Sequence, residues 1–260
     1  MADFVHLHLH THYSLLDGAI KLPDLMERVT ELGMDAVAMT DHGNMYGAVN
    51  FQKAANAADV KPIIGSEMYL TPENFREATD PKSYHVTLLA KDLTGYQNLS
   101  YLNSMAWLEG YHERTETPRI DRDLLAEHRE GLVCLSGDLG GEINQAILND
   151  EMDRAREIAR AYDAIFEDDH FYLEIMDNAF PEQQKCNEAL IELAEELDIP
   201  LVATNDCHYL EQEEARAHAV LMAIQLQKTV DLDRVMEHEV DQLYVRSPEE
   251  MREAFSHVPE

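Results

Sequence analysis

The residues best suited to chemistry lie close to the start of the chain, in the segment HLHTHYSLLDG that ends at Gly18. An apolar strand here would project His6, His8 and His10 to one face, because residues two apart in a strand point the same way. Histidine is neither a preferred core residue nor a strong strand former, so packing explains such a row poorly. With Asp17 before a glycine turn, the segment indicates one side of a metal site.

Other apolar runs along the chain also end in side chains that can bind metal. These fragments are Thr40-Asp41-His42-Gly43, Gly65-Ser66-Glu67, Ser136-Gly137-Asp138 and Asn205-Asp206-Cys207-His208. Alone, each fragment is more typical of a turn than of a ligand. Together they suit zinc, manganese or iron and exceed what one ion could use, which predicts a multinuclear centre. Such centres activate water and stabilise both oxygens of a phosphoryl transfer.

The elements that must position these side chains are short apolar runs alternating with amphipathic helical patterns. We expect strands over 4–10, 35–40, 62–70, 85–90, 131–136, 171–176 and 201–205, and helices over 22–32, 152–166 and 183–197, with a capping box at Ser247. This alternation predicts a parallel sheet covered by helices, open or closed. Because polar residues follow the carboxyl ends of several strands, a distorted TIM-like (β/α)7 barrel with the metal site at those ends is favoured.

Composition narrows the class of protein. The 260 residues carry 51 acidic against 20 basic side chains, a net charge of −31, so the basic footprint of a duplex-binding protein is missing. We interpret the acidic residues as a solvated surface. There is no apolar run long enough for a membrane span and no signal-peptide pattern. Three cysteines without a CxxC pair favour a reducing, cytoplasmic location.

Six blocks of the sequence resemble the polymerase and histidinol phosphatase (PHP) domain family: HLHTHYSLLDG, TDHGNMYG, GSEMYL, YHVTLLAKDLTGYQNL, GLVCLSGDLGGEI and PLVATNDCHYL. TGYQNL and NDCHYL are more similar to the branch at the N-terminus of bacterial DNA polymerase III alpha subunits than to free-standing phosphatases. The resemblance implies a barrel of βα units that holds up to three divalent ions, Zn, Mn, Mg or Fe. It also implies one domain over 1–260, with a barrel core over 1–210 and a helical extension over 211–260 that leads toward the polymerase domains.

The resemblance assigns the metal ligands to nine positions: His8, His10, Asp17, His42, Glu67, His85, Asp138, Asp206 and His208. His85 comes from the resemblance alone, because it begins its apolar run instead of ending it. Asp138 departs from the family, which has cysteine here in the polymerase branch and histidine in the phosphatases. An oxygen donor should shift that position from zinc toward manganese or magnesium. Asp17, His10 and Asp206 are expected to carry catalysis with a metal-activated water.

The function implied is a 3′–5′ exonuclease that removes misincorporated nucleotides during DNA replication. Four carboxylates bring −4 against +6 from three ions, so the site should hold one phosphodiester at a primer 3′ terminus. Expected partners are that terminus, the other polymerase domains, a separate proofreading exonuclease subunit and the sliding clamp. Two alternatives remain: a phosphomonoesterase of the histidinol phosphatase type, and a catalytically silent domain that docks other subunits.

Several other residues are expected to play structural roles. His6 should be a satisfied core histidine and Cys207 should be buried, while His218 and the other scattered histidines should lie at the surface. Asp41 should either orient the histidine that follows it or cap the next helix. For Trp107, the helical spacing of its apolar neighbours favours core or interface packing over base stacking.

Overall fold

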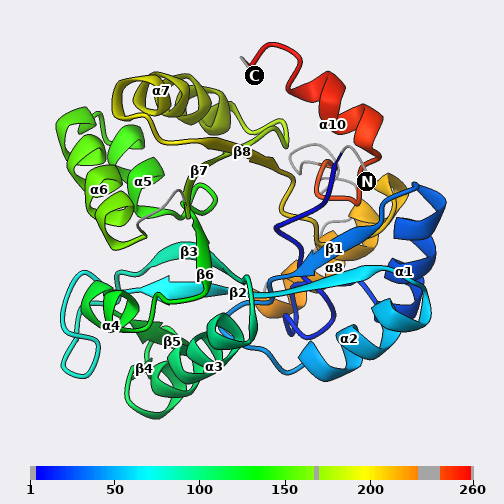
Figure 1. Cartoon of the computed structure of the whole chain (residues 1–260), viewed down its shortest axis with the longest axis horizontal. Helices are drawn as coiled ribbons and strands as arrows, with labels where there is room; N and C mark the ends of the chain where they lie inside the picture. Colours follow the sequence, from blue (N-terminus) through cyan, green and yellow to red (C-terminus); the bar gives the residue numbers. More distant parts are fainter. Residues whose placement is uncertain (1–3, 167–169, 228–240, 259–260) are drawn as a thin grey trace.

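The computed structural model describes residues 4–166, 170–227 and 241–258. In Figure 1 the strands surround the middle of the molecule and the helices lie outside them. The strands of the described residues are β1 (Ala36–Met39), β2 (Lys61–Leu70), β3 (Tyr84–Ala90), β4 (Tyr111–His112), β5 (Thr117–Ile120), β6 (Leu132–Leu135), β7 (Phe171–Met176) and β8 (Leu201–Thr204). Six of them match the predicted apolar runs to within about a residue or two at each end.

The strands form a ring that is closed by the N-terminal segment. Pairing runs in the order β1-β2-β3-β6-β7-β8. Residues 6–10 then fill the remaining gap: the amide of Ala38 donates to the carbonyl of His6 on one side, and the amide of His10 donates to the carbonyl of Cys207 on the other. A bridge between Leu9 and Cys207 completes the contact. The predicted distorted barrel is therefore confirmed, with helices on its outside.

One strand runs against the direction predicted for it. β3 pairs antiparallel with both β2 and β6, although a parallel sheet was expected. The physical reason lies in residues 71–83, which form no helix and simply return the chain, whereas parallel neighbours need a longer crossover, usually helical. As a result, the amino end of β3, where His85 lies, is at the same end of the barrel as the carboxyl ends of its neighbours.

Two further local predictions were wrong. The segment over 4–10 is extended but irregular, because the chain bends at His8 and only isolated bridges form. The stretch from Tyr111 onward, where no strand was predicted, contains the hairpin β4–β5, which adds to the far end of β2 through Tyr69 and Arg119. The hairpin thus extends the barrel wall at its carboxyl end.

The described helices are α1 (Leu22–Glu31), α2 (Ala48–Ala57), α3 (Leu93–Leu108), α4 (Arg122–Glu127), α5 (Glu142–Leu148), α6 (Met152–Ile165), α7 (Pro181–Leu197), α8 (Ala215–Gln225) and α10 (Pro248–Ala254), with a 3-10 turn at Gln212–Glu214. The three predicted helices are confirmed, and Gly33 ends the first with a φ of +71°. The capping box at Ser247 is also present. Among the described residues, no helix is both long and apolar enough for a transmembrane span.

Apolar packing fixes the ring in place from both sides. One cluster under α3 and α5–α7 and another under α1 and α2 cover the outside of the barrel. A third, built around Ala38, Leu89 and Leu135, lines the inside of the barrel toward its amino end. Val245, in the chain that returns beside Tyr209, is fully buried in the cluster under α1 and α2. The strand ends are therefore held rigidly where the polar side chains begin.

Candidate metal centre

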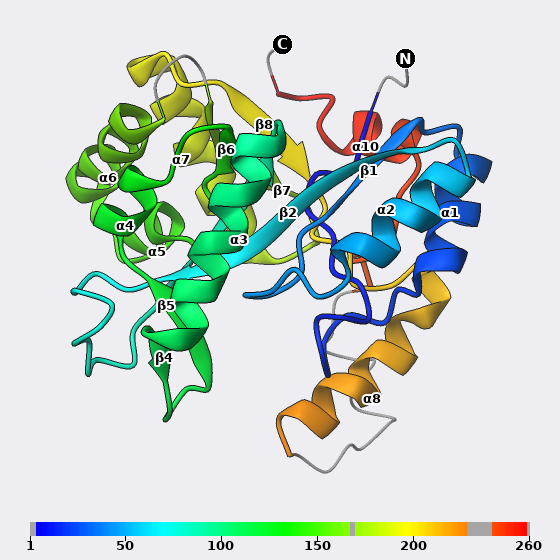
Figure 2. The ribbon, with the colours of Figure 1, turned by 60° about the horizontal axis from the view of Figure 1, so that its bottom comes forward.

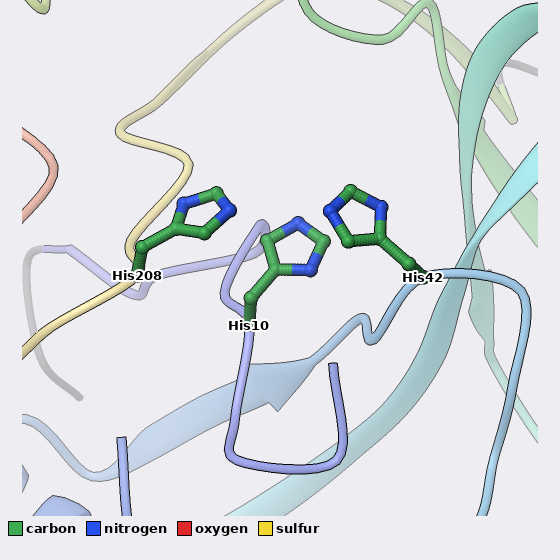
Figure 3. Close-up of side chains that lie close together, drawn as sticks. All are labelled: His10, His42 and His208. Atoms are coloured by element: carbon green, nitrogen blue, oxygen red, sulfur yellow. The ribbon is translucent and has the colours of Figure 1, made fainter. Parts of the chain in front are cut away.

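All nine residues expected to bind metal converge at the carboxyl end of the barrel. Three groups of three have ligand atoms within 4.8 Å of one another: His10/His42/His208, His8/His10/Asp206 and Glu67/His85/Asp138. The ninth residue, Asp17, lies 2.8 Å from the Nε2 atom of His42. In Figure 3 the ring of His10 stands between those of His42 and His208, which come from different parts of the chain.

The barrel topology explains this convergence. His8 and His10 come from the closing segment, His42 follows β1, Glu67 is on β2, His85 begins the reversed β3, Asp138 follows β6, and Asp206 and His208 follow β8. Each residue is at the end of its strand that faces the same rim. The antiparallel direction of β3 gives a geometric reason for the position of His85, which spacing along the sequence did not provide.

Glu67 lies at the centre of the cluster and is 2% exposed. Its Oε2 atom is 2.5 Å from His42 Nδ1 and its Oε1 atom is 3.0 Å from His85 Nδ1. The Nε2 atoms of His8 and His10 lie 3.7 and 3.5 Å away from the same carboxylate. One carboxylate therefore faces four imidazoles.

Asp206 has a comparable position on the other side. Its Oδ1 atom is 3.2 Å from His10 Nε2 and 3.4 Å from His8 Nε2. Its backbone has a φ of +47°, in the left-handed region that non-glycine residues seldom adopt.

The cluster contains polar atoms that the protein itself leaves without hydrogen bonds. Among the described residues, ten buried side-chain nitrogen or oxygen atoms have no such partner, and six of them are here: His8 Nε2, His10 Nε2, His42 Nδ1, Glu67 Oε2, Asp206 Oδ1 and His218 Nε2. These atoms instead lie against one another as ion pairs, such as His42 Nδ1 and Glu67 Oε2 at 2.5 Å. Lone pairs of imidazoles and carboxylates that face a shared space are the donor set a transition-metal ion requires, so the cluster is consistent with metal binding.

Protonation of the cluster follows from the mixture of acids and bases. Burial alone would lower the pKa of His8, but the carboxylates of Glu174 and Asp206 raise it to about 10. Burial, together with the rings of His42 and His208, lowers the pKa of His10 to about 3. His10 is therefore a neutral imidazole, as a metal ligand must be, whereas His8 would have to lose a proton when a metal binds.

Glu174 on β7 belongs to the site but was missed by the sequence analysis. It is 1% exposed and accepts hydrogen bonds from His8 Nδ1 at 2.8 Å, the Thr204 hydroxyl at 2.6 Å and the Gly137 amide at 3.0 Å. A carboxylate on Nδ1 leaves the Nε2 atom of His8 directed at Glu67 and Asp206. The available signal was a single glutamate within the apolar run FYLEIM.

Asp41 has a different role from both of those expected. It accepts from the amide of Thr11 at 2.7 Å, and from the hydroxyls of Thr11 at 2.8 Å and Ser14 at 2.7 Å. Helix α2 has no side-chain cap, and the ring of His42 contacts Asp17 and Glu67 instead. The Ser14 hydroxyl in turn lies 3.0 Å from His10 Nδ1. Asp41 thus orients His10 through Ser14.

Two histidines differ from the sequence predictions: His218 lies closer to the metal cluster than expected, and His6 lies farther from it. His218 on α8 was expected at the surface, but it is 9% exposed and its Nε2 atom lies 3.7 Å from Asp17 Oδ1. His6 is buried as predicted, yet it does not share the face of the metal cluster. It contacts the carbonyl of Arg246 at 2.8 Å and Cys207 Sγ at 3.4 Å, because the bend at His8 interrupts the strand alternation. Cys207 is buried, as expected.

Comparison with known proteins agrees with this geometry. The PHP domain model matches residues 6–178. DNA polymerase III subunit alpha of Thermus aquaticus is 50% identical over 256 residues, which cover 96% of this chain and 21% of that protein. The Treponema pallidum subunit is 43% identical over 262 residues, covering 99% of this chain and 22% of the relative. The chain thus spans about a fifth of the length of these relatives.

The fold is also found among solved structures. A candidate metal-dependent phosphoesterase from Bifidobacterium adolescentis superposes with a TM-score of 0.51 at 17% identity, covering 80% of this chain and 88% of that one. At this identity the likeness concerns the fold alone. Together with the family match, it confirms the resemblance seen in the sequence. The chain belongs to the PHP domain family and is homologous over nearly its whole length to the N-terminal part of DNA polymerase III alpha subunits.

Proposed function

We propose that the cluster binds up to three divalent metal ions and hydrolyses phosphodiester bonds as the 3′–5′ exonuclease of a replicative polymerase. The observation that carries this proposal is the convergence of the imidazole nitrogens of His8, His10 and His42 with the carboxylates of Glu67 and Asp206, all at one rim of the barrel. A domain that served only for docking would have no need to bury so many imidazoles and carboxylates at one rim.

In this proposal the ligands are His8, His10, Asp17, His42, Glu67, His85, Asp138, Asp206 and His208. Bound ions would supply an activated water and stabilise the charge that develops on the phosphate. Glu67 and Asp206 each face several imidazoles, so both are placed to contact more than one ion. His10, Asp17 and Asp206 are the residues we assign to catalysis. Nitrogen and oxygen donors together suit zinc, manganese or iron, and Asp138 favours manganese or magnesium at its own position.

The charge of the molecule restricts the substrate. With −31 overall, the surface has no footprint for a duplex, whereas three ions would leave the site positive against its four carboxylates. The proposed substrate is therefore the 3′ terminus of a primer strand. The remaining polymerase domains, a separate proofreading subunit and the sliding clamp would hold the rest of the DNA. Residues 1–210 would form the catalytic barrel and 211–260 the connection toward those domains.

The test uses the 260-residue chain with manganese and two substrates in separate reactions: a 3′-mismatched primer-template and a small phosphomonoester. Release of nucleotides from the primer 3′ end supports the proposal. The matched control is Asp17→Asn, which removes a charge beside His42 and His208 while keeping the side-chain shape. Activity should fall by about 10³-fold or more, since a metal contributes several kcal/mol of stabilisation to a phosphoryl transition state.

Two outcomes would contradict the proposal. Free phosphate from the monoester without nucleotide release would indicate a phosphatase of the histidinol phosphatase type. Inactivity on both substrates, with a melting temperature that falls steeply in chelator, would indicate a domain that binds metal only for its stability. Full activity of Asp17→Asn would show that the hydrolysis came from a contaminant.

A further inference from the structure

A stacked aromatic pair lies beside the metal centre at the same rim. Trp107, in the last turn of α3, and Tyr111, in β4, have ring centroids 5.4 Å apart with planes at 17°. They are 40% and 41% exposed. The indole Nε1–H of Trp107 donates to the carbonyl of Gly43 at 2.7 Å. Gly43 directly follows His42, so the indole is fixed one peptide away from a residue of the cluster.

The hairpin β4–β5 is what places the pair there. Figure 2 shows the lower end of α3 next to β4 and β5. β5 pairs with the end of β2 at Tyr69, two residues beyond Glu67. Gly43 has a φ of +55°, and a Cβ atom there would lie only 2.7 Å from the ring of Pro118, so glycine is what allows the loop to approach the hairpin this closely.

A third aromatic ring, that of Tyr69, lies against the histidines near the loop at Gly43. The ring of Tyr69 lies 6.1 Å from that of His42 and 5.1 Å from that of His85. A Cβ atom on Gly43 would be 3.4 Å from the same tyrosine ring, which places Tyr69 between the cluster and the loop that accepts from Trp107. A ligand leaving the metal site in this direction would meet aromatic rings and no cationic side chain among these residues.

The packing of α3 does not account for the exposed rings. Leu99, Leu102 and Ala106 of the same helix are fully buried and make its core contact, as their spacing predicted. Trp107 instead faces outward, and its hydrogen bond holds it in one orientation. A rigid, half-exposed aromatic face is typical of a stacking platform for bases, which requires no positive charge. With 20 basic and 51 acidic residues, the chain has little positive charge to attract a nucleotide. A subsite that binds the base by stacking does not need that charge.

We propose that Trp107 and Tyr111 form a stacking subsite for a base of the strand whose terminal phosphodiester lies at the metal centre. This inference rests on the proposed function and deepens it, since it assigns the substrate to nucleic acid and excludes small phosphomonoesters that lack a base. Positioning by stacking increases the affinity for a 3′ terminus and leaves the chemical step to the cluster.

The chain offers a direct probe, because Trp107 is its single tryptophan. Intrinsic fluorescence is titrated with dAMP and, separately, with deoxyribose 5-phosphate in magnesium. We expect quenching by the nucleotide and none by the sugar phosphate. In the primer-template assay, Trp107→Leu should raise KM by about tenfold with kcat nearly unchanged. Tyr101→Ala is the matched control, because Tyr101 is 44% exposed on the same helix and its ring lies against that of His128 instead.

The two proposals fail in different ways. Base-dependent quenching that persists in a chain without hydrolytic activity supports the stacking subsite while the proposed exonuclease fails. Nucleotide release with no quenching, and with Trp107→Leu no different from Tyr101→Ala, overturns the stacking subsite and leaves the exonuclease standing. Trp107→Phe, which keeps an aromatic face, should retain a KM closer to that of the unmodified chain.

Discussion

The two ends of the barrel are built from the same strands but have opposite chemistry. On β2, Ile63 and Glu67 are four residues apart and therefore project to the same face, yet the first packs in an apolar cluster and the second faces four imidazoles. On the reversed β3, Leu89 and His85 repeat the pattern in the other direction. The amino end is thus lined by apolar side chains, whereas the carboxyl end gathers imidazoles and carboxylates. Stability and chemistry are separated along each strand.

The largest effect that would test this separation is a cavity in the apolar cluster inside the barrel, beneath the polar residues. Leu135 is 1% exposed in the apolar cluster with Ala38 and Leu89. We expect Leu135→Ala to lower the free energy of unfolding by about 2–5 kcal/mol, because a buried leucine is replaced by a cavity. Urea unfolding measures this change, and metal content should remain that of the unmodified chain. Leu108→Ala, at a position 79% exposed, is the control. Loss of metal in folded Leu135→Ala would contradict the separation of the two ends.

The parts of the fold that depend on local sequence could be predicted, and those that depend on distant contacts could not. β7 coincides with the predicted run over 171–176, because an apolar segment between polar turns specifies a strand locally. The direction of β3 could not be predicted in this way. Its residues are equally compatible with either direction, and the reversal depends on the helix-free connection over 71–83. The hairpin β4–β5 was missed for a related reason, since its pairing partner on β2 is distant in sequence.

Prediction of the site was limited by long-range contacts. Residues that end an apolar run, such as His42 and Asp206, could be found from the sequence, whereas His85 required the family resemblance. Glu174 and His218 were missed, because their roles depend on partners from other strands: His8 in one case and Asp17 in the other. Local patterns identify which residues could bind metal. The residues that orient them are identified only by the assembled barrel.

His6, just before the bend at His8, provides a second test, through pH. Burial lowers the pKa of His6 from 6.5 to about 4, while His8 is shifted upward. Between these values the unfolded chain binds a proton that folded His6 does not, so stability is unaffected above pH 6.5 and falls as pH decreases toward 4. The full loss corresponds to about 3 kcal/mol. His6→Gln should flatten this part of the pH profile measured by urea unfolding.

The matched control for the pH test is His257→Gln, at an exposed position. It should leave the slope between pH 6.5 and 4 unchanged. If His6→Gln retains the full slope, the acid sensitivity originates in the metal cluster and the assignment of His6 to the core is wrong.

A smaller effect is expected from the residue that orients His8. Glu174→Ala removes three hydrogen bonds that join the closing segment, the loop after β6 and β8. Loss of such a partner typically lowers metal affinity by about 10–100-fold. Titration with zinc, followed by calorimetry, measures the change, and Glu174→Gln should recover part of it because its amide oxygen can still accept from His8. Asp177→Asn, exposed just beyond β7, is the control. Unaltered affinity in Glu174→Ala would show that His8 is not oriented by this carboxylate.

The smallest effect is expected at Asp138, whose side chain is 24% exposed, more than those of Glu67, Asp206 and Asp17. Its Oδ1 atom accepts from the Gly140 amide and lies 3.0 Å from His85 Nδ1. Asp138→Asn keeps an oxygen for the Gly140 amide, so the loop should persist while the charge beside His85 is lost. We expect fewer ions per chain by elemental analysis, with the other positions still occupied.

Asp138→Cys should instead shift the bound metal toward zinc, because a thiolate is a softer donor. Unchanged metal content in Asp138→Asn would show that Asp138 is not a ligand, and the centre would then be confined to the histidines around Asp206 and Glu67.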